Sequence, residues 1–180
     1  MKRALAVAFA CVLMHCCLFI LQTHAQEVHA IKPITDDMLY KLTYPGPKDM
    51  DSIKNVKFIK NGMYTSGKVG SINYYNSRII NRAFGDLNGD GVNDAALIAG
   101  FNTGGSGGFI CLYAVIAAKG NILITEPISL GDRVNIEDVK ITSGKIILKI
   151  LKHKPNDPLC CPTLKTTLTY TYQGGRLVGP

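Results

Sequence analysis

Acidic and amide side chains crowd into the segment GDLNGDGVND, which runs from residue 85 to residue 94. The positions that could offer an oxygen ligand alternate along it: Asp86, Asn88, Asp90, Val92 through its backbone carbonyl, and Asp94. Two carboxylates about 4 Å apart repel each other by about 1 kcal/mol in water and by about 4 kcal/mol near a protein surface. A divalent cation bound between them turns this repulsion into attraction. The spacing therefore predicts a calcium site with these five residues as ligands.

The segment matches the first nine positions of a calcium loop of the D-x-[DN]-x-[DN]-G type. Gly91 allows the backbone to reverse, and hard oxygen ligands suit a hard cation. The position of the closing glutamate of an EF-hand is occupied by Leu97, and both flanks are typical of strands. The segment therefore resembles the DxNxDGxxD loop that joins two strands in FG-GAP and integrin-type propeller blades, with Asp94 as the closing ligand. The alternative is a polar hairpin with splayed, solvated carboxylates.

A second motif, NTGGSGGF at residues 102–109, contains the pattern GxSxG around Ser106. That pattern marks the nucleophile elbow of α/β-hydrolases. Candidate partners follow in the order acid and then histidine: Glu126, Asp132, Glu137, Asp138 and His153. The elbow needs a strand-to-helix turn, whereas both flanks here are typical of strands. We therefore expect a flexible Gly/Ser hairpin and assign no catalytic residue; a serine hydrolase that uses Ser106 is an alternative.

The start of the chain is typical of a secretory signal peptide over residues 1–25. Two basic residues precede an apolar run over residues 4–21, and the small residues Thr23 and Ala25 occupy the −3 and −1 positions of a cleavage site. We therefore expect a periplasmic or secreted protein with no membrane span after cleavage. An uncleaved anchor is the alternative. Lipidation stays open, although His15 before Cys16 fits it badly.

The 180 residues are enough for one domain with a hydrophobic core. Removal of residues 1–25 leaves 18 Lys plus Arg against 13 Asp plus Glu, a formal charge of +5. The bases are scattered, and no run of Lys or Arg interleaved with aromatics is present. The sequence therefore gives no local support for nucleic-acid binding.

Three cysteines remain after cleavage, namely Cys111, Cys160 and Cys161. In an oxidising compartment, three cysteines allow one intrachain disulfide and leave one thiol. A bond between Cys160 and Cys161 would close a strained ring and rigidify a turn; its rival would join Cys111 to one of them. The residues alone leave these pairings open.

The rest of the chain is typical of strands punctuated by glycine turns. Apolar or alternating runs recur as NVKFIK, SINYYNSRIINRAF, DAALIAGF, FICLYAVIAA, ILITEPISL, RVNIEDVKI, IILKILK and TLKTTLTYTY. The helical periodicity of a parallel βαβ sheet is missing, and no internal repeat is present. The sequence predicts a mainly β (β-rich α+β) fold, a single antiparallel-sheet domain with at most one or two short helices.

The domain boundaries follow from this pattern. Residues 26–52 form an N-terminal segment, with a short helix in TDDMLYKL and Thr35 as its cap. Residues 53–180 form the β-rich domain that contains the calcium loop at residues 86–94.

In order, the motifs DLNGDGVNDAAL, GGSGGFICLYAV, LGDRV and DPLCCPT resemble an exported bacterial domain family of unassigned function. That family includes proteins similar to the mycobacterial LppP/LprE-type lipoproteins, and the resemblance covers about residues 38–178. The family pattern has an aromatic residue where this chain has Cys111. The resemblance therefore implies a disulfide between Cys160 and Cys161, a buried thiol at Cys111, and a non-catalytic protein of the cell envelope.

Two functions of different classes remain beside the serine hydrolase. The first is a calcium-stabilised binding domain for an envelope protein or glycan. The second is a periplasmic inhibitor of a hydrolase such as lysozyme, which would insert the uncharged TGGSGG loop into an active-site cleft. Lysozyme and this chain are both basic, and their like charges disfavour that pairing.

Overall fold

The computed structural model describes residues 31–51 and 53–180, which form antiparallel β-sheets and one short helix. The described elements are α2 (Asp36–Leu39), β1 (Tyr44–Pro45), β2 (Asn55–Val56), β3 (Tyr64–Ser66), β4 (Tyr75–Gly85), β5 (Asp94–Asn102), β6 (Phe109–Ala118), β7 (Asn121–Ile124), β8 (Ile128–Asp132), β9 (Asn135–Thr142), β10 (Lys145–Lys152), β11 (Leu164–Gln173) and β12 (Arg176–Val178). The predicted mainly β fold is confirmed. The predicted signal peptide lies outside the described residues.

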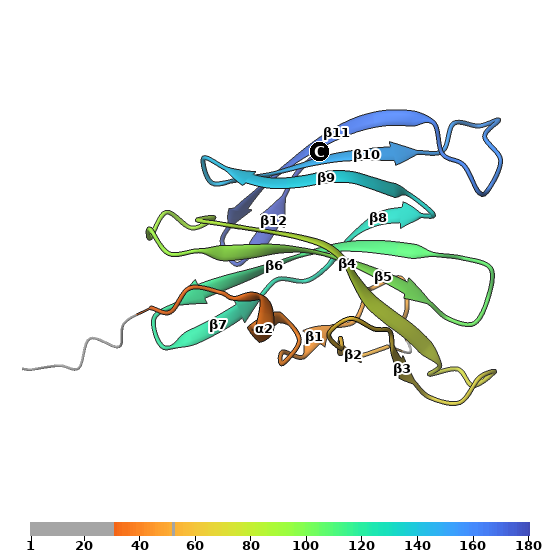
Figure 1. Ribbon diagram of the computed structural model, residues 1–180, viewed down its shortest axis with the longest axis horizontal. Helices are drawn as coiled ribbons and strands as arrows, with labels where there is room; N and C mark the ends of the chain where they lie inside the picture. The colour runs from red at the N-terminus through yellow and green to blue at the C-terminus, as the bar shows by residue number, and fades with distance from the viewer. Residues whose placement is uncertain (1–30, 52) are drawn as a thin grey trace, which may run out of the picture. The chain divides into compact units, whose positions relative to one another are not determined.

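Two larger sheets make up most of the fold (Figure 1). One has the strand order β3-β4-β5-β6-β7. Strand β8 pairs with β6 along the same edge of β6 as β7 does. The other has the order β12-β11-β10-β9, and β1 and β2 form a small separate sheet. Neighbouring strands in these sheets are mostly neighbours in the sequence, because short glycine turns join antiparallel strands directly. Gly174 and Gly175, both with positive φ, turn the chain between β11 and β12.

The two larger sheets pack face to face, and their apolar side chains share one core. Ile98 and Leu112 from the first sheet pack there with Ile146 and Leu148 from the second. The fit is close at Gly85, where an added Cβ would lie 2.7 Å from Ile141 Cγ2. This packing explains the alternating pattern of β10, which turns one face to the core and the other to water.

A second core lies on the opposite face of the central strands. Along β5, Ala95, Leu97 and Ala99 join this second core, whereas Ala96 and Ile98 join the core between the sheets. Successive side chains of a strand point to opposite faces, so a strand that is covered on both faces needs a continuous apolar run. The runs in β5 and β6 have this physical origin.

The N-terminal segment covers this second core. Tyr44 has no exposed surface, and its ring centroid lies 4.9 Å from that of Phe58 and 5.4 Å from that of Tyr113. Its hydroxyl donates to the carbonyl of Leu39, at 2.8 Å. Residues that precede the larger sheets in the sequence therefore form part of the same hydrophobic packing.

The predicted short helix is present as the single turn α2. Thr35 occupies the N-cap position, but its side chain makes no capping hydrogen bond. The two acidic residues of the turn instead form ion pairs with distant side chains, Asp36 with Arg82 and Asp37 with Lys60. Among the described residues, no helix is long and apolar enough to cross a membrane.

Candidate functional site

The acidic segment, for which the sequence predicts a calcium loop, forms the turn between β4 and β5. Gly89 and Gly91 have φ angles of 83° and 79°, in the left-handed region that glycine adopts readily. A Cβ at either position would meet open space, so the backbone angle and not crowding favours glycine there. The expected role of Gly91 in reversing the backbone agrees with this geometry.

Asp86 organises the first half of the turn through its carboxylate. One oxygen accepts hydrogen bonds from the backbone N–H of Gly89, at 2.6 Å, and of Asn88, at 3.1 Å. The other oxygen accepts from the N–H of Gly91, at 2.9 Å. These backbone bonds, led by that of Gly91, lower the pKa of Asp86, because N–H donors stabilise the ionised form. The backbone thus offsets part of the repulsion that the crowded carboxylates create.

The side chains of Asn88 and Asp90 also accept hydrogen bonds from backbone N–H groups of the same turn. Asn88 Oδ1 accepts from the N–H of Asp90, at 3.0 Å, and Asp90 Oδ1 accepts from the N–H of Val92, at 2.8 Å. The amide nitrogen of Asn88 donates to Asp90 Oδ2, at 3.0 Å, and to the carbonyl of Ala117, at 3.2 Å. The loop is therefore internally hydrogen-bonded and also tied to the end of β6.

Asp94 is the buried anchor of the turn, with no exposed surface. Its Oδ2 accepts from the N–H of Leu87, and its Oδ1 accepts from the N–H of Ala117, both at 2.8 Å. Desolvation raises the pKa of Asp94, and the charges of Asp90 and Asp86 raise it further. The sequence motif marks Asp94 as a ligand but carries no signal for Ala117, which lies on another strand.

The donor chemistry of this turn fits a hard cation, because its candidate ligands are all oxygens. Within residues 31–51 and 53–180, however, no three His, Cys, Asp or Glu side chains are grouped closely enough to hold a metal ion. The carboxylates of Asp86 and Asp94 face backbone N–H groups instead. A carboxylate oxygen has about two lone-pair directions, so each oxygen of Asp94 keeps one for a further partner.

The Gly/Ser segment forms the turn between β5 and β6 and is held from within by Asn102. The amide nitrogen of Asn102 donates to the carbonyls of Gly105, at 2.9 Å, and Gly107, at 2.7 Å. Its amide oxygen accepts from the N–H of Gly104, at 2.7 Å. The expected hairpin is present, and this one side chain restrains most of its backbone.

Two residues at the end of β8 hold the same turn from outside. The guanidinium of Arg133 donates to the carbonyl of Ser106, with the shorter contact at 2.8 Å. Asp132 Oδ1 accepts from the N–H of Gly108, at 2.7 Å, and its other oxygen pairs with Arg133, also at 2.8 Å. The sequence motif gave no sign of either residue, because they lie more than 20 positions further along the chain.

Ser106 lies exposed at the tip of this hairpin, with a strand on each side. The turn therefore differs from the strand-to-helix geometry of a nucleophile elbow. Among the described residues, the polar contact of its hydroxyl is with Arg133, at 3.4 Å, and no histidine or carboxylate bonds to it. A serine nucleophile needs a base within hydrogen-bond reach, whereas the hydroxyl of Ser106 contacts the guanidinium of Arg133.

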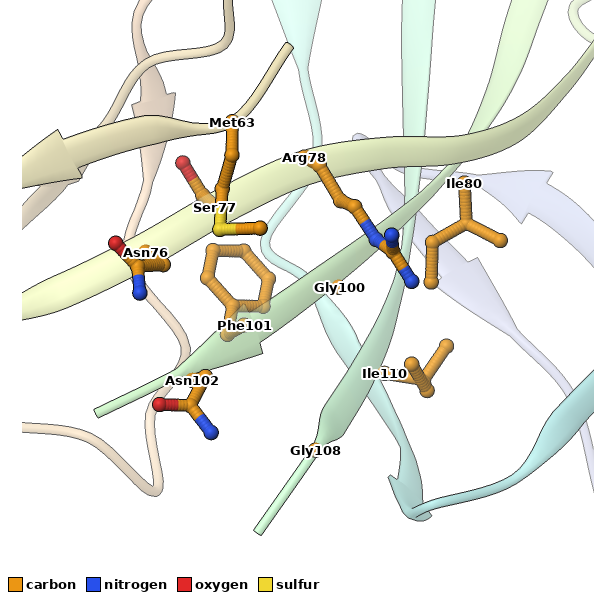
Figure 2. Close-up of a pocket in the computed structure, with 10 residues that line it drawn as sticks. All are labelled: Met63, Asn76, Ser77, Arg78, Ile80, Gly100, Phe101, Asn102, Gly108 and Ile110. Carbon is orange, nitrogen blue, oxygen red and sulfur yellow. The ribbon is translucent and has the colours of Figure 1, made fainter. Parts of the chain in front are cut away.

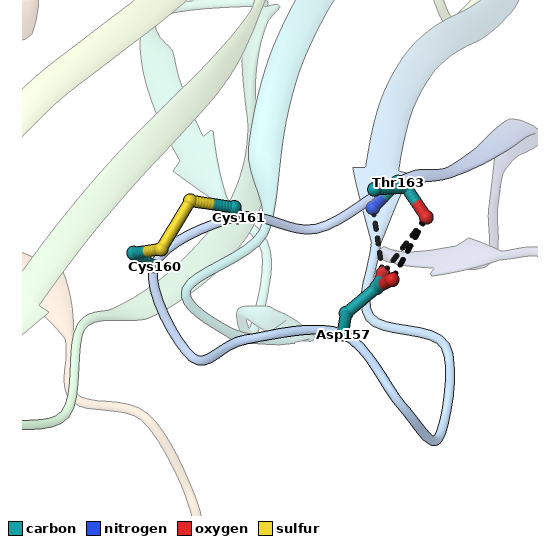
Figure 3. The surroundings of a disulfide bond; sticks show 4 residues. All are labelled: Asp157, Cys160, Cys161 and Thr163. Atoms are coloured by element: carbon teal, nitrogen blue, oxygen red, sulfur yellow. Dashed lines mark hydrogen bonds between the residues drawn. A yellow bond between two sulfur atoms is a disulfide. The ribbon is translucent and has the colours of Figure 1, made fainter.

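The disulfide joins Cys160 to Cys161 (Figure 3). Cys111 is buried as a free thiol in β6. Burial raises the pKa of Cys111 to about 12, so this thiol is inert at neutral pH. The disulfide lies in the exposed loop between β10 and β11. Asp157 closes this loop by accepting from the N–H groups of Lys154, at 2.9 Å, and Thr163, at 2.8 Å.

Comparisons of this chain with protein-family models, with curated proteins and with solved structures found no match.

Proposed function

We propose that this protein is an exported, non-catalytic binding domain whose β4–β5 turn holds a structural calcium ion. The observation that supports the proposal most strongly is the placement of Asp94. This carboxylate is fully buried and connects the turn to β6, and its burial, together with the charges of Asp90 and Asp86, raises its pKa. A cation at this point would stabilise the ionised carboxylate and fasten two strands of the central sheet together. The partner would be an envelope protein or a glycan.

The ligands of the ion would be the side chains of Asp86, Asn88, Asp90 and Asp94 with the backbone carbonyl of Val92. The backbone bonds that these side chains already make fix their orientation, which reduces the entropy lost on binding. Extracellular modules bind calcium with dissociation constants of about 10⁻⁴–10⁻³ M. At ten times such a concentration, bound calcium stabilises the folded state by about 1.4 kcal/mol.

We expect calcium to raise the melting temperature of the processed protein by roughly 3–6 °C over its value in chelator. Asp90→Ala should abolish this difference, because it removes one carboxylate ligand. Asp90→Asn should also abolish most of it, while keeping the acceptor for the Val92 N–H. Differential scanning calorimetry in calcium and in chelator measures the effect.

Asp138→Ala is the matched control, because it removes an acidic residue from β9 and leaves the turn intact. Its calcium response should equal that of the unmodified protein. Identical melting curves with calcium and with chelator, together with no saturable heat in a calcium titration, would refute the calcium site. An intact calcium response with no binding to any envelope protein or glycan would instead refute only the binding role.

A second candidate function is inhibition of a hydrolase by the TGGSGG loop, and the two-sided support of that loop favours it. Asn102 and Arg133 hold the loop while Ser106 stays exposed at its tip. A loop that is already ordered before binding loses less conformational entropy in a complex. The geometry thus has the pre-organisation that an inserting loop needs.

We expect inhibition of lysozyme, if this candidate holds, to weaken about fivefold in Asn102→Ala, since the loop then loses bonds worth about 1 kcal/mol of ordering. Asn156→Ala, in the loop between β10 and β11, is the control and should inhibit like the unmodified protein. A lysis assay on cell-wall substrate measures both variants. The absence of inhibition by the unmodified protein would exclude this candidate.

A further inference from the structure

A hollow of about 240 Å³ opens beside the base of the TGGSGG loop (Figure 2). Asn102 and Gly108, at the two ends of the loop, form part of its lining. Its volume lies just under the range of about 300–1,000 Å³ for pockets that take drug-sized ligands. The hollow therefore suits one small group, of the size of a single aromatic ring or a branched aliphatic chain.

Gly100 is part of the lining of the hollow and lies between two larger residues of the neighbouring strands. In the sheet, Gly100 pairs with Arg78 on one neighbouring strand and with Ile110 on the other. A Cβ on Gly100 would lie 2.8 Å from Ile80 Cδ1 and 3.7 Å from Ile110 Cδ1, so the side chains of these two isoleucines already fill the space directly above the glycine. One row across the sheet thus presents the guanidinium of Arg78, a glycine covered by Ile80, and the apolar side chain of Ile110.

The floor and walls of the hollow are largely apolar. Met63, Ile80, Phe101 and Ile110 belong to its lining, and Figure 2 shows the side chain of Arg78 extending toward Ile80. Met63 and Ile80 are both partly exposed, at 49% and 36% of their surface. A ligand that covers these two side chains would remove apolar surface from water, which favours binding.

The polar groups at the rim differ in how far they are already satisfied. Asn76 bonds to Thr65 and Tyr74, and Asn102 bonds to the backbone of its own loop. The side-chain amides of Asn76 and Asn102 are therefore already hydrogen-bonded within the protein.

Arg78 is different, because its side chain is exposed and forms no ion pair with any residue in the described part of the chain. Arg82 and Arg133, by contrast, each pair with an aspartate. The hollow therefore combines apolar walls with one uncompensated positive charge.

We propose that this hollow binds small carboxylates that carry one compact apolar group. The guanidinium of Arg78 has the fork of N–H donors that matches a carboxylate with two parallel hydrogen bonds. The apolar group would lie against the exposed side chains of Ile80 and Met63. The carboxylate would come from a free metabolite or from the end of a peptide chain, which share this chemistry. The inference does not depend on calcium or on the inhibitor role.

Titration of the processed protein with phenylacetate, followed by amide chemical shifts, tests the proposal. We expect saturable shifts at Gly100, Gly108 and Ile110 with a dissociation constant in the low millimolar range, as is typical of so small a ligand. Phenylacetamide has the same ring without the charge and should bind about tenfold more weakly. A dipeptide that ends in phenylalanine distinguishes a free metabolite from the end of a peptide chain as the source of the carboxylate. It will bind only if the hollow can accept the end of a peptide chain.

Two variants and one control complete the test. Arg78→Gln should weaken phenylacetate binding about tenfold and leave phenylacetamide binding unchanged. Gly100→Ala should weaken both ligands, because Ile80 must then move into the hollow. Arg176→Gln removes the same charge from β12 and should change neither. Equal affinity for the two ligands, equal weakening by Arg176→Gln, or no saturable shift at these amides would overturn the proposal.

Discussion

Asp94→Ala is expected to lower the free energy of unfolding by about 3–5 kcal/mol, even in the presence of chelator. The side chain has no exposed surface and accepts the N–H groups of Leu87 and Ala117. Its removal leaves two backbone donors without partners, and each such buried donor costs about 1–3 kcal/mol. Urea unfolding of the metal-free protein, followed by circular dichroism, measures the loss.

Asp157→Ala is the matched control for this variant. Asp157 likewise accepts two backbone N–H groups, those of Lys154 and Thr163, but it lies in the exposed loop that contains the disulfide. Water can replace its carboxylate there, so the loss should be much smaller. Equal losses for the two variants would show that burial of Asp94 is not what makes its hydrogen bonds important.

The pH dependence of stability separates Asp94 from Asp86. Burial raises the pKa of Asp94 above its unfolded value, so its proton stabilises the fold below about pH 4, and this contribution is lost as pH rises through the folded pKa. Asp86 has a lowered pKa, so its contribution is present above about pH 4 and is lost as pH falls through its folded pKa. Asp94→Asn should remove the first dependence and keep the second, in unfolding curves recorded between about pH 3 and pH 7.

Tyr44→Ala is expected to lower the free energy of unfolding by a similar amount, about 3–5 kcal/mol. The ring is fully buried between Phe58 and Tyr113 and joins the N-terminal segment to the central sheet. Truncation to alanine removes these contacts and leaves a cavity. Tyr44→Phe should cost only about 1 kcal/mol, because it deletes the single hydrogen bond to Leu39.

Tyr40→Ala is the control for the position of this ring, since Tyr40 is half-buried at the end of α2. Tyr40→Ala should lower the free energy of unfolding by a clearly smaller amount in the same urea experiment.

Burial also raises the pKa of Tyr44 and of Tyr113, so both stay neutral in the folded state. Their contribution is complete below about pH 10 and is lost at higher pH, where tyrosine ionises in the unfolded chain. A stability unchanged in Tyr44→Ala would show that the N-terminal segment is not part of the main core.

Features that depend on neighbouring residues could be predicted from the sequence. The continuous apolar runs gave the buried strands β5 and β6, and the alternation in TLKTTLTYTY gave β11. The turn at Gly91 and the hairpin around Ser106 followed from glycine and from strand-like flanks. These features are local, because the backbone conformation of a residue depends mainly on its own side chain and those beside it.

Pairing across the fold was decided by the tertiary structure. No local pattern indicated that two sheets pack face to face, or that the N-terminal segment covers the far side of the central strands. An apolar strand shows that both faces are buried but does not show what buries them. The disulfide between Cys160 and Cys161 depended on both sequence and tertiary structure. The adjacency of the two cysteines in the sequence permitted it, and the burial of Cys111 in β6 removed the rival pairing.

The candidate sites show the same division. The motif at residues 86–94 placed Asp94 in the turn, but strand register alone brought the N–H of Ala117 to its carboxylate. Register likewise placed Arg78 opposite Gly100, next to a bulge between Ile79 and Asn81 that no local pattern announces. Arg133 reaches Ser106 from the bend that follows β8, a strand paired with β6. A slip of one residue would turn each of these side chains to the opposite face, so such contacts are fixed only when the whole sheet closes.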